Sequence, residues 1–414
     1  MKVLVVGSGG REHAFVRALA ADGGVTQQYA APGNPGMEAQ AEVHAVAVDD
    51  VAAVVDLARR LGVDLVVVGP EAPLVAGLAD ALTEAGIACF GPTAAAAQLE
   101  GSKAFAKDVM SAAGVPTAAA HTCESPAEVE KALDAFGAPY VVKQDGLAGG
   151  KGVLVTPDRA AAVAHASAAG KVVVEEYLDG PELSVFAVTD GTTVVPLQPA
   201  QDFKRAYDGD DGPNTGGMGA YSPLPWAPPD LVDQVLAQVV QPTVDEMRRR
   251  GTPFAGMLYA GLAATSRGLR VVEFNCRLGD PDGLVVLARL QSPLLPLLHA
   301  AAVGDLAAVP APAWSGAAAV TVVVAAEHYP AAPVKGDPIE GLAEAAAVPG
   351  AYVLHAGTKR TGDALVTAGG RVLDVIGTGP TVAAARQTAY QALGHVRIRG
   401  SQHRTDIAAA AAHS

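Results

Sequence analysis

Short, uninterrupted apolar runs that end in glycine-containing loops recur through the first hundred residues and limit the fold more than any other feature. Leu65–Val68 is followed by Gly69, and the opening run at 2–6 is followed by Gly7. Such strands suit a parallel sheet that helices cover on both faces, with ligands at the carboxyl ends of the strands. The expected strands lie at 2–6, 43–48, 63–68 and 87–90, and the expected helices start near Arg11 and span 51–61 and 74–85. We therefore expect an open parallel α/β sheet domain over residues 1–101.

The pattern changes after residue 101. A helix is expected at 102–113, followed by strands at 139–144, 152–156, 172–177 and 183–189. After these we expect a helix at 230–250, strands at 255–264 and 269–275, and a helix through 282–300. The last part shows strands at 317–325, 351–355 and 371–376 and an amphipathic helix at 381–394. We expect a second domain at 102–307 with a mobile α+β subdomain at about 115–190, and a mixed α/β domain at 316–414.

Two irregular segments stand out. The Gly/Asp/Pro-rich stretch 202–223 is too long for a simple connector, and such loops are commonly functional, so we expect it to bind a ligand. The Ala-rich segment after Asp406 is expected to fray.

Composition excludes several classes of protein. A chain of 414 residues exceeds one usual hydrophobic core. A formal net charge of −14, with no run of Lys or Arg longer than three residues, argues against nucleic-acid or membrane surfaces. The first residues lack signal-peptide features and the apolar runs are too short to cross a bilayer, so we expect a cytoplasmic location. Cys89, Cys123 and Cys276 are far apart, which indicates neither a disulfide framework nor a thiolate zinc site.

The first candidate site is the glycine turn Gly7–His13 after the first strand. Bare backbone at a helix N-terminus can accept a phosphate or a carboxylate, although a tight turn without a ligand has the same pattern. Glu12 stands where a dinucleotide fingerprint needs Gly or Ala, which counts against a nicotinamide site.

The second candidate is the glycine-rich loop Lys143–Gly152. It is not a Walker loop, because Lys151 is followed by Gly152. A flexible loop of this kind can close over polyphosphate while Lys143 and Lys151 neutralise charge. The alternative is a glycine-rich hairpin with solvated lysines.

Two further segments carry carboxylates. Val172–Leu178 reads as a strand that enters a hinge, which could present its backbone to an adenine, with Glu182 available for ribose hydroxyls. In the strand that starts at Leu269, the period of two places Glu273, Asn275 and Arg277 on one face, where a carboxylate and an amide suit Mg²⁺. Each segment could instead be an ordinary polar strand. Cys276 points to the opposite face, so we interpret it as core.

These features occur in the order typical of an ATP-grasp domain, and the chain resembles the phosphoribosylamine–glycine ligase family over essentially its whole length. The segments that carry the resemblance are Gly7–His13, Ala31–Asn34, Gly69–Leu74, Gln98–Phe105, Gly212–Pro223, Glu273–Pro281 and His355–Lys359. GPNTGGMGAYSP and EFNCRxGDP are specific to that family.

The resemblance implies a role for particular residues. For ATP, the residues implied are Lys103, Lys143, Gly149, Gly150, Lys151, Glu175, Glu176, Tyr177, Leu178 and Glu182. For Mg²⁺ or Mn²⁺, they are Glu273 and Asn275. For the sugar phosphate, they are Gly9, Gly10, Arg11, Glu71, Asp280 and Lys359, and for glycine Asn214, Thr215, Gly217, Met218 and Arg277. The implied catalytic residues are Lys143, Lys151 and Arg277.

The implied activity is the ATP-dependent ligation of glycine to 5-phosphoribosylamine in de novo purine biosynthesis, through glycyl phosphate, by a monomer without nucleic-acid or membrane partners. The sequence departs from the family pattern at Phe203, usually His, at a shortened 163–171, and at Asp282-Gly-Leu, usually Glu-Thr-Gln, which puts a polar role there in doubt. The alternatives are another ATP-grasp ligase, a nicotinamide oxidoreductase and a non-catalytic nucleotide-binding protein.

Overall fold

A five-stranded parallel sheet organises the first part of the chain in the computed structural model, which describes residues 1–149 and 152–413. Its order is β3-β2-β1-β4-β5, formed by β1 (Lys2–Gly7), β2 (Gln27–Pro32), β3 (Glu42–Val43), β4 (Leu65–Val68) and β5 (Ala88–Phe90). The helices are α1 (Gly10–Ala20), α2 (Val51–Leu61), α3 (Glu71–Val75) and α4 (Leu78–Glu84). The predicted parallel α/β sheet is confirmed, and its strand order reverses between β1 and β4, where such sheets hold ligands.

Two local predictions in this sheet need correction. The strand expected at 43–48 has only two residues, Glu42–Val43, and the strand beside β1 is β2, which runs into Ala31. The helix expected at 74–85 is divided into α3 and α4, because Gly77 adopts the left-handed conformation with φ 90° and interrupts the helical path.

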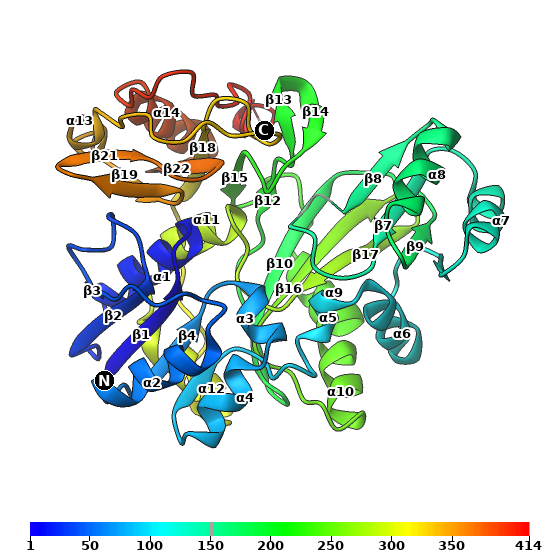
Figure 1. The fold of residues 1–414 in the computed structure, drawn as a ribbon, viewed down its shortest axis with the longest axis horizontal. Coiled ribbons are helices and arrows are strands. Elements are labelled where there is room, and N and C mark those ends of the chain that lie inside the picture. Colours follow the sequence, from blue (N-terminus) through cyan, green and yellow to red (C-terminus); the bar gives the residue numbers. More distant parts are fainter. Residues whose placement is uncertain (150–151, 414) are drawn as a thin grey trace.

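A small antiparallel sheet lies apart from the rest, at the right of Figure 1. Its order is β6-β9-β7-β8, from β6 (Ala120–Cys123), β7 (Tyr140–Gln144), β8 (Val153–Thr156) and β9 (Val172–Glu175), with α7 (Pro126–Phe136) and α8 (Arg159–Ser167) packed on it. This unit has a hydrophobic core of its own, which includes Val142, Val174 and Leu133. Neither helix was predicted, although Ser125 and Glu128 form a capping box that marks the start of α7.

A larger antiparallel sheet, β11-β10-β16-β17, faces the small one. It consists of β10 (Glu182–Asp190), β11 (Val194–Pro196), β16 (Ala255–Thr265) and β17 (Gly268–Asn275). The helices of this part are α5 (Gln98–Gly101), α6 (Lys103–Ala113), α9 (Leu231–Val235), α10 (Gln241–Arg249), α11 (Asp282–Arg289) and α12 (Leu295–Val303). The helix expected at 282–300 is two helices, since Pro293 cannot continue α11. Although the sequence groups β10 with the small unit, it pairs with β16 along its whole length.

The third sheet joins distant parts of the chain. Its order is β12-β15-β18-β22-β19, formed by β12 (Gln201–Asp202), β15 (Gly219–Ser222), β18 (Ala318–Ala325), β19 (Ala351–His355) and β22 (Arg371–Gly379). Two separate two-stranded hairpins belong to this part of the molecule: β13 (Arg205–Tyr207) with β14 (Asp211–Asn214), and β20 (Thr358–Thr361) with β21 (Ala364–Thr367). Its helices are α13 (Leu342–Ala346) and α14 (Val382–Leu393). The stretch 202–223 is therefore ordered structure and contributes strands to this sheet. The domain limits themselves stay a prediction.

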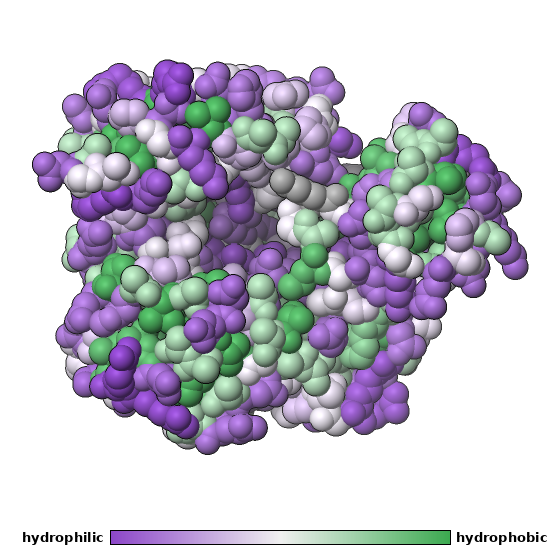
Figure 2. Space-filling view, in the orientation of Figure 1, coloured by the Kyte–Doolittle hydropathy of each residue, from purple (hydrophilic) through white to green (hydrophobic). Residues whose placement is uncertain are grey.

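The segment after Asp406 is packed rather than frayed, because Ile407, Ala408 and Ala411 are buried in the main core. In the described part of the chain, helices with the length and apolar character needed to span a membrane are absent. Figure 2 shows a hollow with hydrophilic walls between the upper, lower and right-hand parts of the molecule.

Candidate active site

A cavity of about 1300 Å³ lies between the small sheet β6-β9-β7-β8 and the larger sheet β11-β10-β16-β17. It extends to the point of the parallel sheet where the strand order reverses. Most of the predicted site residues line it, and these are Arg11, Glu71, Lys103, Lys143, Gly149, Glu175, Glu176, Tyr177, Leu178, Glu182, Asn214, Thr215, Glu273, Asn275, Arg277 and Asp280. Those that do not line it are Gly9, Gly10, Gly217, Met218 and Lys359. Gly150 and Lys151 lie outside the described residues. Met218 is fully buried in the core, and Lys359 is exposed on β20.

Lysines concentrate where the small sheet meets α6. Lys143 on β7 and Lys107 on α6 both pair with the carboxylate of Glu175, at 2.8 Å and 3.1 Å. Lys143 also donates to the carbonyl of Val272 at 2.9 Å, which ties the small sheet to β17. Lys107 was missed by the sequence reasoning, although it lies four residues after Lys103 and therefore on the same face of α6.

The start of the glycine-rich loop is tied to the N-terminus of α6. The hydroxyl of Ser102 and the backbone N–H of Ala104 donate to Asp145, at 3.1 Å and 3.2 Å. Lys103 donates to the carbonyl of Gly146 at 3.1 Å. Gly146 has φ 107°, a conformation that favours glycine. The helix that presents Lys103 and Lys107 therefore also anchors the loop.

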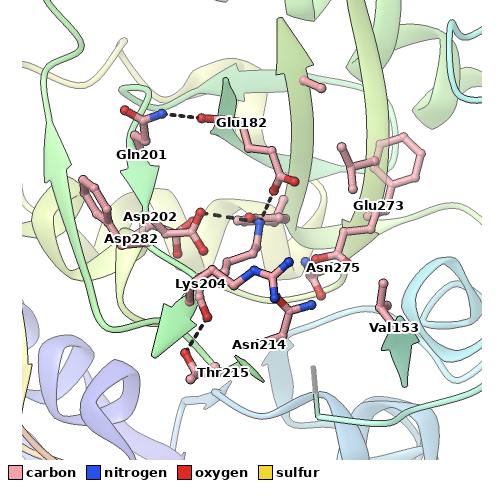
Figure 3. A pocket seen from close by; sticks show the side chains of 18 of the residues that line it. Val153, Glu182, Gln201, Asp202, Lys204, Asn214, Thr215, Glu273, Asn275 and Asp282 are labelled. Carbon is pink, nitrogen blue, oxygen red and sulfur yellow. Dashed lines mark hydrogen bonds and ion pairs between the residues drawn. The ribbon is translucent and has the colours of Figure 1, made fainter. Parts of the chain in front are cut away.

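An ionic cluster lies on the side of the cavity opposite the small sheet (Figure 3). The ammonium of Lys204 pairs with Glu182 at 2.6 Å and with Asp202 at 3.5 Å. Burial, together with the neighbouring charge of Asp282, raises the pKa of Asp202 to about 7, and Lys204 opposes this shift. Burial disfavours the charge on Lys204, yet Asp202 and Glu182 raise its pKa well above the ordinary value. The prediction identified Glu182 but not Lys204 or Asp202.

Asp282 and Phe203, two positions where the sequence departs from the family pattern, both make specific contacts in the structure. Asp282 accepts a hydrogen bond from the hydroxyl of Ser184 at 2.5 Å, so the polar role that the sequence put in doubt is present. Phe203 acts as an apolar platform: the guanidinium of Arg404 lies 5.0 Å from the centre of its ring, and the ring of Tyr221 lies 6.2 Å away. The shortened segment 163–171 ends α8 and reaches β9 through a short turn.

Glu273 and Asn275 both line the cavity, as the alternation along β17 predicts. They lie near Glu182 in Figure 3. One carboxylate and one amide oxygen suit a hard cation that shares its remaining positions with water and phosphate oxygens. In the described part of the chain, no group of three or more His, Cys, Asp or Glu side chains could hold a metal ion.

Arg277 is held by two carboxylates. It pairs with Glu71 from α3 at 3.2 Å and with Glu100 from α5 at 3.1 Å. Its burial disfavours the charge, but both carboxylates keep its pKa above the usual range, so it remains a cation. Glu100 was missed. It also accepts from the backbone N–H of Cys276 at 2.8 Å and from its thiol at 3.1 Å, so Cys276 is buried, as predicted, but contacts the same carboxylate as Arg277.

The glycine turn carries a carboxylate of its own. The backbone N–H of Gly9 donates to Glu12 at 2.5 Å. A Cβ placed on Gly7 or Gly69 would come within 2.3 Å or 2.0 Å of the Glu12 side chain. Glu12 therefore fills the space between β1 and β4 that a dinucleotide pyrophosphate needs, which argues against the nicotinamide alternative. Arg11 turns toward the cavity and donates to the carbonyl of Leu278 at 3.1 Å.

Comparisons with known proteins agree with this arrangement. The chain matches family models of phosphoribosylglycinamide synthetase for the N domain at residues 1–100, the ATP-grasp (A) domain at 101–283 and the C domain at 319–410. It is 66% identical over 414 residues to a phosphoribosylamine–glycine ligase of Streptomyces coelicolor, covering 100% of both chains.

Solved structures extend the likeness to the fold. A phosphoribosylamine–glycine ligase from Thermotoga maritima superposes with a TM-score of 0.85 at 33% identity, covering 98% of this chain and 100% of that one. A biotin carboxylase from Campylobacter jejuni has a TM-score of 0.74 at 14% identity, covering 97% and 92%, which indicates a common fold alone. On its sequence, its sheets and the residues that line its cavity, the chain belongs to the phosphoribosylglycinamide synthetase family.

Proposed function

We propose that the protein joins glycine to 5-phosphoribosylamine, consumes ATP, and releases glycinamide ribonucleotide, ADP and phosphate in de novo purine biosynthesis. The observation that carries the proposal is one cavity that brings together the cations of α6 and β7 and the Glu273, Asn275 and Arg277 side chains at the end of β17. The lysines can neutralise the phosphates of a nucleotide. The side chains of β17 can hold a cation and stabilise the phosphoryl group as it moves to a carboxylate.

ATP is proposed to lie between the two antiparallel sheets. Lys103, Lys143 and Lys151 would neutralise its phosphates, Gly149 and Gly150 would approach them, the Glu175–Leu178 hinge would hold the adenine, and Glu182 would accept from the ribose hydroxyls. Glu273 and Asn275 would hold Mg²⁺, or Mn²⁺ in its place. When bound, such a cation neutralises charge that develops on the phosphates.

The two substrates are proposed to meet beside Arg277. Glycine would lie near Asn214–Met218, and the sugar phosphate would contact Gly9–Arg11, Glu71, Asp280 and Lys359. Glu71 and Glu100 support this placement, because they fix the orientation of the guanidinium fork of Arg277.

The reaction needs no protein nucleophile. A carboxylate oxygen of glycine bonds to the γ-phosphorus of ATP as the bond to ADP breaks, which forms glycyl phosphate. The amine of 5-phosphoribosylamine then attacks the acyl carbon, phosphate leaves and the nitrogen loses a proton. Positioning and charge stabilisation by Lys143, Lys151 and Arg277 supply the rate enhancement. We also propose a cytoplasmic monomer with domains at 1–101, 102–307 and 316–414, without nucleic-acid or membrane partners.

An ADP-release assay tests the proposal. ADP should form only when glycine and 5-phosphoribosylamine are both present, in Mg²⁺ and separately in Mn²⁺. Release with a different acid or amine would favour another ATP-grasp ligase, and bound ATP without release would favour a non-catalytic nucleotide-binding protein.

A metal-site variant sharpens the same assay. Glu273→Gln should lower turnover at least about tenfold, which corresponds to about 1.4 kcal/mol of transition-state stabilisation. Glu84→Gln, on the exposed surface of α4, is the matched control. Equal turnover of the two variants at saturating Mg²⁺ would contradict the metal role of Glu273.

A further inference from the structure

The segment 404–411 reaches from the third sheet to the cavity and packs against the β13–β14 hairpin. Arg404 is 1% exposed, and Ala408–Ala411 line the cavity. Figure 1 shows this hairpin beside the end of the chain, away from the rest of the ATP-grasp part. The Ala-rich composition predicted frayed chain here, so its burial needs an explanation.

Three residues of the segment, Arg404, Thr405 and Asp406, form hydrogen bonds with the hairpin. Arg404 donates to the carboxylate of Asp210 at 2.7 Å and to the carbonyl of Arg205 at 3.3 Å. The backbone N–H of Thr405 donates to Asp208 at 2.7 Å, and its hydroxyl donates to the same carboxylate. In the other direction, the backbone N–H of Gly209 donates to Asp406 at 2.8 Å. Charge-assisted bonds of this kind are the stronger ones, and within this set the guanidinium of Arg404 is the group shielded from water, since its side chain is 1% exposed.

The opposite side of the segment is fixed to α14. The hydroxyl of Tyr390 donates to the carbonyl of Arg404 at 2.8 Å. Arg386 donates to the carbonyls of Thr405 at 2.6 Å and Ile407 at 2.9 Å. The segment thus bridges a rigid helix of the third sheet and a two-stranded hairpin that has little core of its own, and an isolated two-stranded hairpin is at best marginally stable.

Backbone strain marks the same contact. Among the described residues, three that are not glycine have a positive φ, and two of them are Asp210 at 55° and Ala408 at 58°. Asp210 is the acceptor for Arg404, and Ala408 lines the cavity. Such conformations persist where the surroundings dictate them, and they are commonest at functional sites.

The hairpin carries a site residue at each end. Lys204 directly precedes β13, and β14 ends at Asn214. The backbone N–H and the hydroxyl of Thr215 both donate to the carbonyl of Lys204, each at 2.8 Å, which closes the base of the hairpin. A contact that holds the tip in place therefore also sets the position of Lys204 beside Glu182 and of Asn214 in the cavity.

We infer that the segment 404–411 is a strap and that Arg404 is a positioning residue, which together hold the hairpin so that Lys204 and the glycine-binding residues Asn214 and Thr215 are in place. The catalytic part of this inference rests on the proposed function. The structural part, that Arg404 orders the hairpin, does not.

Hydrogen exchange tests the structural part. In Arg404→Gln, the amides of residues 205–214 should exchange at least about tenfold faster than in the wild type, while those of β18 and β22 keep their protection. Arg399→Gln is the matched control, because Arg399 also pairs with an aspartate, Asp337 at 2.6 Å, but does so away from the hairpin. Unchanged exchange at 205–214 in Arg404→Gln would overturn the strap, whatever the activity.

A second variant covers a folding defect. If Arg404→Gln loses protection in β18 and β22 as well, Thr405→Val decides, since Thr405 is exposed and its hydroxyl donates to Asp208. Faster exchange confined to 205–214 in that variant supports the strap, and unchanged exchange overturns it.

Steady-state kinetics test the catalytic part. Arg404→Gln should raise the KM for glycine at least about fivefold and change the KM for 5-phosphoribosylamine by less than about twofold, because the latter is expected at the parallel sheet. Arg404→Lys should recover only part of the loss, since it keeps the charge but not the planar fork. Equal shifts in both KM values would overturn the positioning role. A wild-type chain without glycine-dependent ADP release would overturn the proposed function and leave the exchange result standing.

Discussion

Glu175 shows what a single buried side chain does for the charge of the cavity. It is 3% exposed and its two oxygens accept from Lys107 and Lys143, so neither lysine is free to turn into solvent. Burial lowers the pKa of Lys107 and Glu175 opposes that shift. Two lysines and one carboxylate leave one positive charge beside the site proposed for the phosphates.

The residue-scale prediction follows from that charge. Lys107→Met removes it, so the KM for ATP should rise at least about fivefold, or about 1 kcal/mol, with a smaller change in the KM for glycine. Lys131→Met, on the exposed face of α7, is the control for loss of a nearby lysine. If both variants keep the wild-type KM for ATP, Lys107 serves only the packing of α6.

At the scale of elements, the contact of α1 with β22 leaves no room for a side chain. A Cβ on Gly10 would lie 2.1 Å from a carboxylate oxygen of Asp374 on β22. Asp374 is 1% exposed, and neither oxygen has a hydrogen-bond partner among the described residues. Burial, with the nearby charge of Asp280, raises its pKa well above the ordinary value, although Arg371 opposes this. The helix start and the strand thus approach each other at a cost in desolvation.

A double-mutant cycle measures this contact. Asp374→Ala should raise the free energy of unfolding by about 1–3 kcal/mol, because it removes a buried, unpaired carboxyl group. Gly10→Ala should lower the free energy of unfolding, because its Cβ would collide with Asp374. In the Asp374→Ala background the decrease should be smaller by at least about 1 kcal/mol. The measurement is denaturant unfolding of the four proteins. Strict additivity would mean that the two residues do not touch in solution.

At the scale of the molecule, two neutral histidines join the parallel sheet to the third sheet. The backbone N–H of His355 on β19 donates to Nδ1 of His13 on α1 at 2.8 Å, which requires that nitrogen to be unprotonated. Burial, with the charges of His355 and Arg17, lowers the pKa of His13 to about 3. Burial, with Arg360 and against Glu38, lowers the pKa of His355 to about 4.

The pH dependence of stability follows from these values. An unfolded histidine takes up its proton near pH 6.5, so below that pH the unfolded chain binds more protons than the folded one. The stabilisation is complete above pH 6.5 and declines toward pH 3–4 by about 1.4 kcal/mol per pH unit for each histidine. The Tm should therefore fall between pH 7 and pH 5, and fall less in His13→Asn, which keeps an acceptor that does not titrate. Calorimetry at the two pH values checks this, and parallel curves for the two proteins would exclude His13 as the cause.

Local pattern explains how much of the fold could be predicted. The unbroken apolar strands predict the parallel sheet, and the period of two along β17 places Glu273 and Asn275 on the face that lines the cavity. Two of the errors in the elements occurred where a single residue interrupts a pattern, as Gly77 divides one helix and Pro293 another. The glycine-rich loop and the segment Gly212–Pro223 identify the family because their characteristic residues are consecutive in the sequence.

By itself, the sequence determined the parallel α/β sheet of the first part, the placing of Glu273 and Asn275 on one face of β17, and the family. Only the tertiary structure decided which charges meet: Glu175 with Lys107, Arg277 with Glu100, Arg404 with Asp210, and Asp374 with the start of α1. The reason is physical. A periodic pattern depends on neighbours along the chain, whereas the stability of a buried charge depends on the partner that the fold brings to it, and for Arg404 and Asp210 that partner is 194 positions away.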